Sequence, residues 1–114
     1  HVDRRLITLS KELDTATTWL MDAEEGFMAA KTAHDLAAAT SRMRIKQRMI
    51  ENGEKPTIQE VEDRALIAIR EELTSLNAAE GIVKAARANS ARLRVQIDIA
   101  RSVGASVRAA MDIG

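Results

Sequence analysis

The sequence predicts an all-α protein, a long antiparallel helical hairpin of the coiled-coil type, forming a single domain over residues 1–114. Apolar and small residues recur at alternating steps of three and four, which is the spacing of a coiled-coil seam. Asn52-Gly53 can adopt the positive φ angles that end a helix, and Pro56, the only proline, cannot continue one. Two helices of roughly 50 residues, each about 70 Å long, share little core. We therefore expect several copies to assemble into a helical homo-oligomer.

The first helix is predicted from about residue 3 to residue 51, because this stretch has no proline and Gly26 is its only glycine. Beyond its regular seam, we expect the apolar stripe to shift, in a way that resembles a stutter, to Met43, Gln47 and Ile50. The regular seam consists of Leu6, Leu9, Leu13, Ala16, Leu20, Ala23, Phe27, Ala30, His34 and Ala37.

The second helix is predicted over about residues 57–111, after a turn at 52–56. Thr57 and Glu60 have the spacing of a capping box, which marks a helix start. Gly104 marks a point at which this helix can break. The apolar or small positions along its face are Ile58, Val61, Ala65, Ile69, Leu73, Leu76, Ala79, Val83, Ala86, Ser90, Leu93, Ile97, Ala100, Gly104 and Val107.

A second apolar stripe flanks this face over the C-terminal third of the chain. One partner helix cannot cover both stripes, so we expect neighbouring copies to share the wide face. The residues assigned to oligomerisation are Val95, Ile99, Val103, Val107 and Ala110.

Catalytic residues are poorly represented. The chain has no cysteine, no Gly-rich phosphate loop and no nucleophile elbow. His34 occupies a seam position, where a histidine can act as a metal ligand or base but is more often a hydrogen-bonded core residue. Adjacent acids such as Glu24-Glu25 point about 100° apart on a helix and do not share a proton. We expect no enzyme activity, no metal and no cofactor.

The overall charge is balanced, with 17 basic and 17 acidic residues. No uncharged run approaches the roughly 20 apolar residues that span a bilayer, so we expect no membrane partner. The absence of cysteine fits a reducing cytosol, and we expect a cytoplasmic location.

A short basic run, Arg42, Arg44, Lys46 and Arg48, interrupts the mainly acidic blocks of the sequence. Such charges can pair with acids on the opposite leg of the hairpin, each exposed pair contributing less than about 1 kcal/mol. Alternatively, the alternate spacing directs some of them away from any one partner helix, and an oligomer would then present a strongly positive surface to a phosphate backbone. The run is the candidate nucleic-acid-binding site.

The layout of the chain resembles the UvsY family of phage recombination mediators, small helical proteins that load a RecA-like recombinase onto single-stranded DNA. The resemblance implies a ring-forming homo-oligomer, with Arg42, Arg44, Lys46 and Arg48 matching the family's basic segment and the stretch from Val95 to Ala110 serving assembly. It also implies the cytoplasm of a bacterial host as the location. The stretches that carry the likeness are Met28-Ala29-Ala30-Lys31, Arg42 to Arg48, Asn52-Gly53, Glu60-Val61-Glu62-Asp63 and Ile97 to Arg108.

A second interpretation belongs to another class: a non-enzymatic structural or adaptor coiled-coil protein, such as a virion assembly factor or a regulator that binds a host protein through a helical face. Both interpretations predict an oligomer. They differ at the basic run, because only a recombination mediator requires it to bind DNA.

Overall fold

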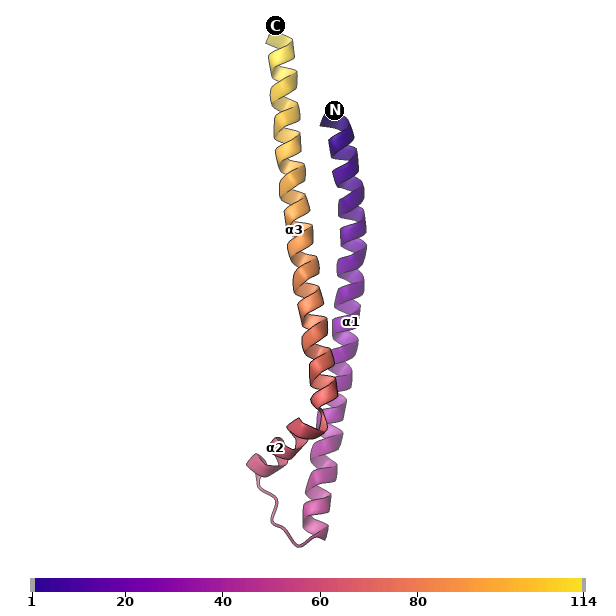
Figure 1. The fold of residues 1–114 in the computed structure, drawn as a ribbon, viewed down its shortest axis with the longest axis vertical. Coiled ribbons are helices and arrows are strands. Elements are labelled where there is room, and N and C mark those ends of the chain that lie inside the picture. The colour runs from indigo at the N-terminus through magenta and orange to yellow at the C-terminus, as the bar shows by residue number, and fades with distance from the viewer. Residues whose placement is uncertain (1, 114) are drawn as a thin grey trace. The chain divides into compact units, whose positions relative to one another are not determined.

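The computed structural model describes residues 2–113, with side chains placed for residues 4–112. Over this part of the chain all regular structure is α-helical: α1 (Val2–Glu51), α2 (Ile58–Ala68) and α3 (Arg70–Ile113), drawn in Figure 1. The predicted all-α class is confirmed. Residues 1 and 114 of the predicted domain lie outside the described residues, and the homo-oligomer stays a prediction.

The chain divides into two compact units. The first unit combines the chain up to Glu24 with the chain from Ile82 onwards, and the second runs from Glu25 to Gly81. Each unit therefore contains one part of α1 and one part of α3, and the second unit also contains α2.

The first unit is an antiparallel pair of helices. Leu9, near the start of α1, packs in one buried cluster with Ile97 of α3. Further along α1, Oε1 of Glu24 lies 3.5 Å from Nη2 of Arg87, which precedes Ile97 in α3. This order fixes the antiparallel direction that the sequence predicts. The buried members of the cluster are Leu9, Ala16, Leu93 and Ile97, and Leu6, Leu13 and Ala100 pack at its edge.

The predicted seam of the first helix is confirmed, because every one of its positions from Leu6 to Ala37 is buried or half-buried. On the second leg, every predicted position is likewise at least half-buried except Ile58 and Val107, which are exposed. Ile58 is 84% exposed because it is the first residue of α2 and projects into solvent.

The predicted shift of the stripe beyond Ala37 is wrong. Met43 is 72% exposed and Ile50 64% exposed, and Gln47 is also exposed. The physical reason is that this part of α1 follows the ordinary helical period of about 3.6 residues, so the seam drifts gradually instead of jumping. The residues that continue the seam are Ala38, Ser41, Ile45 and Met49.

A glycine turn ends α1 as predicted. Gly53 has φ +76°, its amide donates to the Ile50 carbonyl at 3.0 Å, and the Glu54 amide donates to the Met49 carbonyl at 2.8 Å. These two bonds form a Schellman motif, which satisfies carbonyls that the helix end would otherwise leave unpaired.

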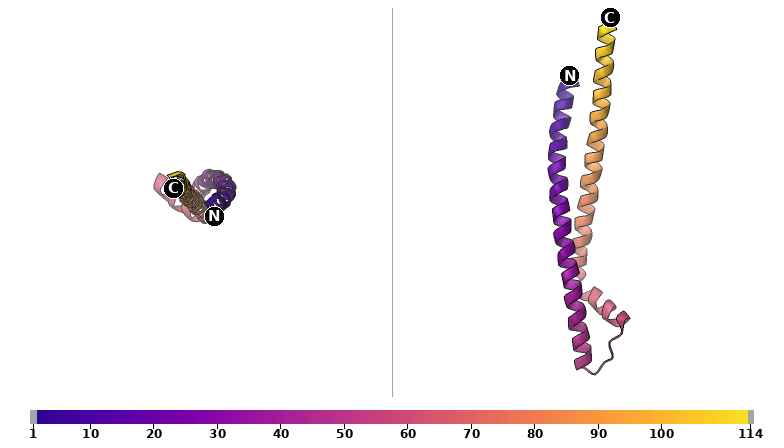
Figure 2. Two further views of the ribbon diagram at one scale, coloured as in Figure 1. Left: turned by 90° about the horizontal axis from the view of Figure 1, so that it is seen from above. Right: turned by 180° about the vertical axis from the view of Figure 1, so that it is seen from behind.

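The second leg differs from its prediction at one point. Thr57 does cap α2, its hydroxyl accepting from the Glu60 amide at 3.2 Å, but the helix is interrupted at Ile69, whose φ of −103° and ψ of 18° are not helical. The side chains of Val61, Ala65 and Ile69 are all buried, so α2 turns its own stripe inward within the second unit, and Figures 1 and 2 show it departing from the line of α3. The helix does not break at Gly104, where the sequence would allow it, since α3 continues to Ile113 with Gly104 buried.

Two glycines in the second unit provide a matched stability test. Gly26 lies inside α1, and a Cβ added there meets no atom within 4 Å, so Gly26→Ala should raise the free energy of unfolding by about 0.5–1 kcal/mol. Gly53→Ala has the same open space but a positive φ, and should lower it by about 1 kcal/mol. Urea denaturation measures both, and a neutral Gly53→Ala would contradict the left-handed turn.

Candidate nucleic-acid interface

The predicted basic run lies on the last turns of α1, in the second unit. We call Arg42, Arg44, Lys46 and Arg48 the basic segment. Because residues four apart are neighbours on a helix, Arg44 and Arg48 share one side of α1 while Arg42 and Lys46 share another. The segment therefore presents its charges in two directions, as its spacing predicts.

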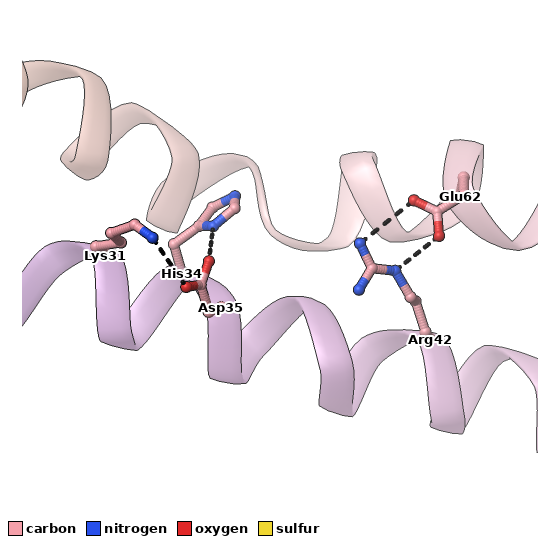
Figure 3. Close-up of polar contacts among 5 residues, drawn as sticks. All are labelled: Lys31, His34, Asp35, Arg42 and Glu62. Atoms are coloured by element: carbon pink, nitrogen blue, oxygen red, sulfur yellow. Dashed lines mark hydrogen bonds and ion pairs between the residues drawn. The ribbon is translucent and has the colours of Figure 1, made fainter.

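Arg42 already has a partner. Its Nε lies 2.7 Å from Oε1 of Glu62 on α2, and its Nη2 lies 3.4 Å from Oε2, as Figure 3 shows. This two-point contact joins α1 to α2, and the negative charge of the Glu62 carboxylate balances the positive charge of the Arg42 guanidinium. Both side chains are about half exposed, so the pair contributes less than about 1 kcal/mol. Arg42 thus follows the pairing interpretation of the basic run.

The other three members of the basic segment remain available. Arg44, Lys46 and Arg48 are exposed, and no carboxylate in the described part of the chain lies within ion-pair distance of them. A further ion pair joins Arg64 of α2 to Glu54 of the turn at 3.5 Å. Three cations within two turns of α1 are therefore open to an external anion.

The residues predicted for oligomerisation lie on the uncovered side of α3 in the first unit. Val95, Ile99, Val103, Val107 and Ala110 are all exposed, whereas Leu93 and Ile97 on the same helix face α1 and are buried. One partner helix therefore leaves this second stripe open, as predicted. Whether another copy covers it stays a prediction.

Sequence analysis missed a second uncovered apolar stripe in the second unit. Leu36, Met43 and Ile50 recur every seven residues along α1 and are exposed by 64% or more. Their seven-residue spacing is a signal that the sequence does contain. The predicted shift had instead assigned Met43 and Ile50 to the continuation of the seam.

His34 is half-buried on α1 and contacts the carboxylate of its neighbour Asp35. Its Nδ1 is 3.1 Å from Oδ1 of Asp35, and because a carboxylate can only accept, the ring N–H donates (Figure 3). Lys31 Nζ approaches the other oxygen, Oδ2, at 3.7 Å. This hydrogen bond, together with the weaker attraction of Lys31, holds the pKa of Asp35 below its ordinary value of 3.8.

Among the described residues, histidine, aspartate and glutamate side chains form no group of three that could hold a metal ion. Within the same residues, no helix is long and apolar enough to cross a membrane.

The fold and these surfaces define an all-α protein of paired helices with an open basic segment and open apolar stripes. No protein-family profile, curated protein or solved structure matches the chain. The resemblance to the UvsY family therefore stays a hypothesis, carried by the quoted stretches of sequence.

The Asp35 contacts generate a test of local electrostatics. A carboxyl whose folded-state pKa is depressed adds stability that is complete above its ordinary pKa of 3.8 and is lost as the pH falls from there through the lower pKa of the folded state. Removing the hydrogen bond with His34→Leu should raise the pKa of Asp35 more than Lys31→Ala does. Carboxyl-carbon NMR titration measures both shifts, and a larger effect of Lys31→Ala would contradict the assigned order of causes.

Proposed function

We propose that the protein is a non-enzymatic helical homo-oligomer that binds single-stranded DNA through its basic segment. The observation that carries the proposal is the set of three exposed and unpaired cations on the last turns of α1: Arg44, Lys46 and Arg48. Following the family resemblance, the bound strand would be prepared for a RecA-like recombinase in the cytoplasm of a bacterial host. The recombinase and the phage setting rest on the resemblance alone.

The chemistry of the basic segment suits a phosphate backbone. Arg44 and Arg48 are four residues apart, and their Cβ atoms are about 5–6 Å from each other at that spacing. Two guanidinium groups on one side of a helix can each contact a phosphate, and binding then gains from the release of counterions. The chain as a whole has no net charge, so the attraction is local to this segment and grows with the number of subunits.

Self-association is supported by the open apolar stripe on α3. Val95, Ile99 and Val103 are exposed large apolar residues at regular four-residue steps. Exposed apolar surface of this kind is typical of protein interfaces, and a second copy of the same helix would remove it from water. Assembly would bring several basic segments into one complex.

A second candidate function, a structural or adaptor protein, is favoured by a different observation. Leu36, Met43 and Ile50 form an uncovered stripe on the same helix as the basic segment. A partner helix with matching heptad spacing could cover this stripe without contacting DNA.

Charge reversal of the basic segment separates the two candidates. Arg44→Glu with Arg48→Glu should abolish most binding to a labelled single-stranded oligonucleotide, and loss of two phosphate contacts should reduce the slope of log K against log salt by about 1.4. Fluorescence anisotropy across a salt series measures both, with duplex of the same sequence for comparison. Circular dichroism should show unchanged helix content.

The matched control is Arg42→Ala with Glu62→Ala, which removes an arginine from the basic segment but leaves the net charge unchanged because its ion-pair partner is removed too. This variant should bind nearly as the parent does. If the parent protein itself fails to bind the single strand at low salt, the DNA-binding proposal is wrong and the adaptor function takes its place.

A further inference from the structure

A groove of about 850 Å³ lies between α1 and α3 within the first unit. Its lining combines apolar and polar side chains and includes one aromatic residue, Trp19. From α1 it receives Arg5 and Lys11 as well as Trp19, and from α3 it receives Asn89, Arg92 and Gln96. We call this the Trp19 groove. It is separate from the basic segment, which belongs to the second unit.

The charge of the Trp19 groove favours an anion. Arg5, Lys11 and Arg92 contribute three positive charges, and Glu12 is the only acid among its lining residues. The Arg92 Nη2 donates to Oδ1 of Asn89 at 2.9 Å, which restricts the guanidinium and leaves its other N–H groups free to donate. The cations lie along α1 from Arg5 to Lys11 and across on α3, so they suit an extended ligand with repeated negative charge.

Trp19 supplies the other part of the recognition. The side chain is 41% exposed although it is large and apolar, and it lies at one end of the α1 side of the groove. An accessible indole in a groove that also contains cationic side chains is a platform on which a nucleobase can stack, and such stacking tolerates any base. The amide of Gln96 has both a donor and an acceptor and can pair with a base edge, whereas Asn89, whose Oδ1 accepts from Arg92, offers its N–H groups as donors.

We propose that the Trp19 groove binds a segment of single-stranded nucleic acid, with a base stacked on Trp19 and the flanking phosphates held by Arg5, Lys11 and Arg92. From residue 5 to residue 19 the groove follows about 21 Å of α1, which accommodates several nucleotides. The inference rests on the proposed single-strand binding and assigns it a second, base-reading site. Double-stranded DNA fits poorly, because its bases are already stacked on one another and cannot reach the indole.

The opposite side of the same helix pair lacks these features. A smaller groove of about 320 Å³ is lined there by Asp14 and Asp98 as well as Arg94 and Arg101, so its charges balance, and it contains no aromatic residue. Arg92 and Arg94 therefore lie two residues apart on α3 but line different grooves. They form a matched pair for testing which side contacts the strand.

The test uses the intrinsic fluorescence of the full chain, because Trp19 is its only tryptophan and it has no tyrosine. Titration with a single-stranded oligothymidylate should quench the indole emission in step with binding. An abasic oligonucleotide of the same length, which has phosphates but no bases, should leave the emission largely unquenched. Trp19→Leu, which keeps an apolar side chain of similar reach, should weaken oligothymidylate binding measured by anisotropy roughly 5- to 100-fold.

The arginine pair provides a readout that does not depend on the tryptophan. Arg92→Ala should reduce the slope of log K against log salt by about 0.7, as expected for one phosphate contact, while Arg94→Ala should leave it unchanged. Equal effects of the two variants would overturn the inference, and so would equal quenching by the abasic strand or by an acidic peptide such as polyglutamate.

The outcomes also separate this inference from the proposed function. In one outcome, the parent protein binds oligothymidylate without quenching, Trp19→Leu does not weaken the binding, and Arg44→Glu with Arg48→Glu abolishes it. This outcome would overturn the Trp19 groove and leave the basic segment as the binding site. Binding that depends on Trp19 and Arg92 but not on Arg44 and Arg48 would support the groove and remove the basic segment. Absence of binding at low salt would overturn both.

Discussion

The structure of each unit depends on a narrow seam between helices, and several of the side chains buried in these seams are small. Ala16, Ala23 and Ala38 are buried along α1, and Ala65 and Ala86 are buried on the second leg. Among the described residues the largest side chains that are fully buried are Leu9 and Met49, one in each unit. Alanine seams let helices approach closely but remove little apolar area from water, at about 25 cal/mol per Å². Each unit consequently has a thin core, and much of each helix surface remains open to partners.

This constraint links the fold to the proposed functions. A pair of helices has two outer sides and two lateral grooves, and these surfaces carry different chemistry here. In the first unit one groove combines Trp19 with three cations while the other is balanced in charge. In the second unit α2 engages Arg42 through Glu62 and leaves the neighbouring cations unpaired. The proposed single-strand binding and self-association require no catalytic pocket. They require only that the open cationic surfaces contact a phosphate backbone and that the open apolar stripe of α3 contacts a second copy of the chain.

The sequence predicted the features that depend on local chemistry. The seam from Leu6 to Ala37 follows from heptad spacing, and the positive φ of Gly53 follows from its place after a long helix. The break at Ile69 could not be predicted, because no glycine or proline lies there and the interruption depends on burying α2 against its own unit. One wall of the Trp19 groove could be predicted from the sequence, because Arg5, Glu12 and Trp19 recur every seven residues on α1. Its other wall, with Asn89, Arg92 and Gln96, depends on the register between helices, which spacing within one helix does not fix.

We propose that copies of this hairpin assemble and carry a single strand as one complex. Sedimentation velocity tests it most directly, with the unmodified chain and a single-stranded oligonucleotide whose dye absorbs where the protein does not. The account predicts a protein species heavier than the 12.5 kDa monomer, with the dye moving at the same rate. A single species of monomer mass with the dye sedimenting separately would contradict it.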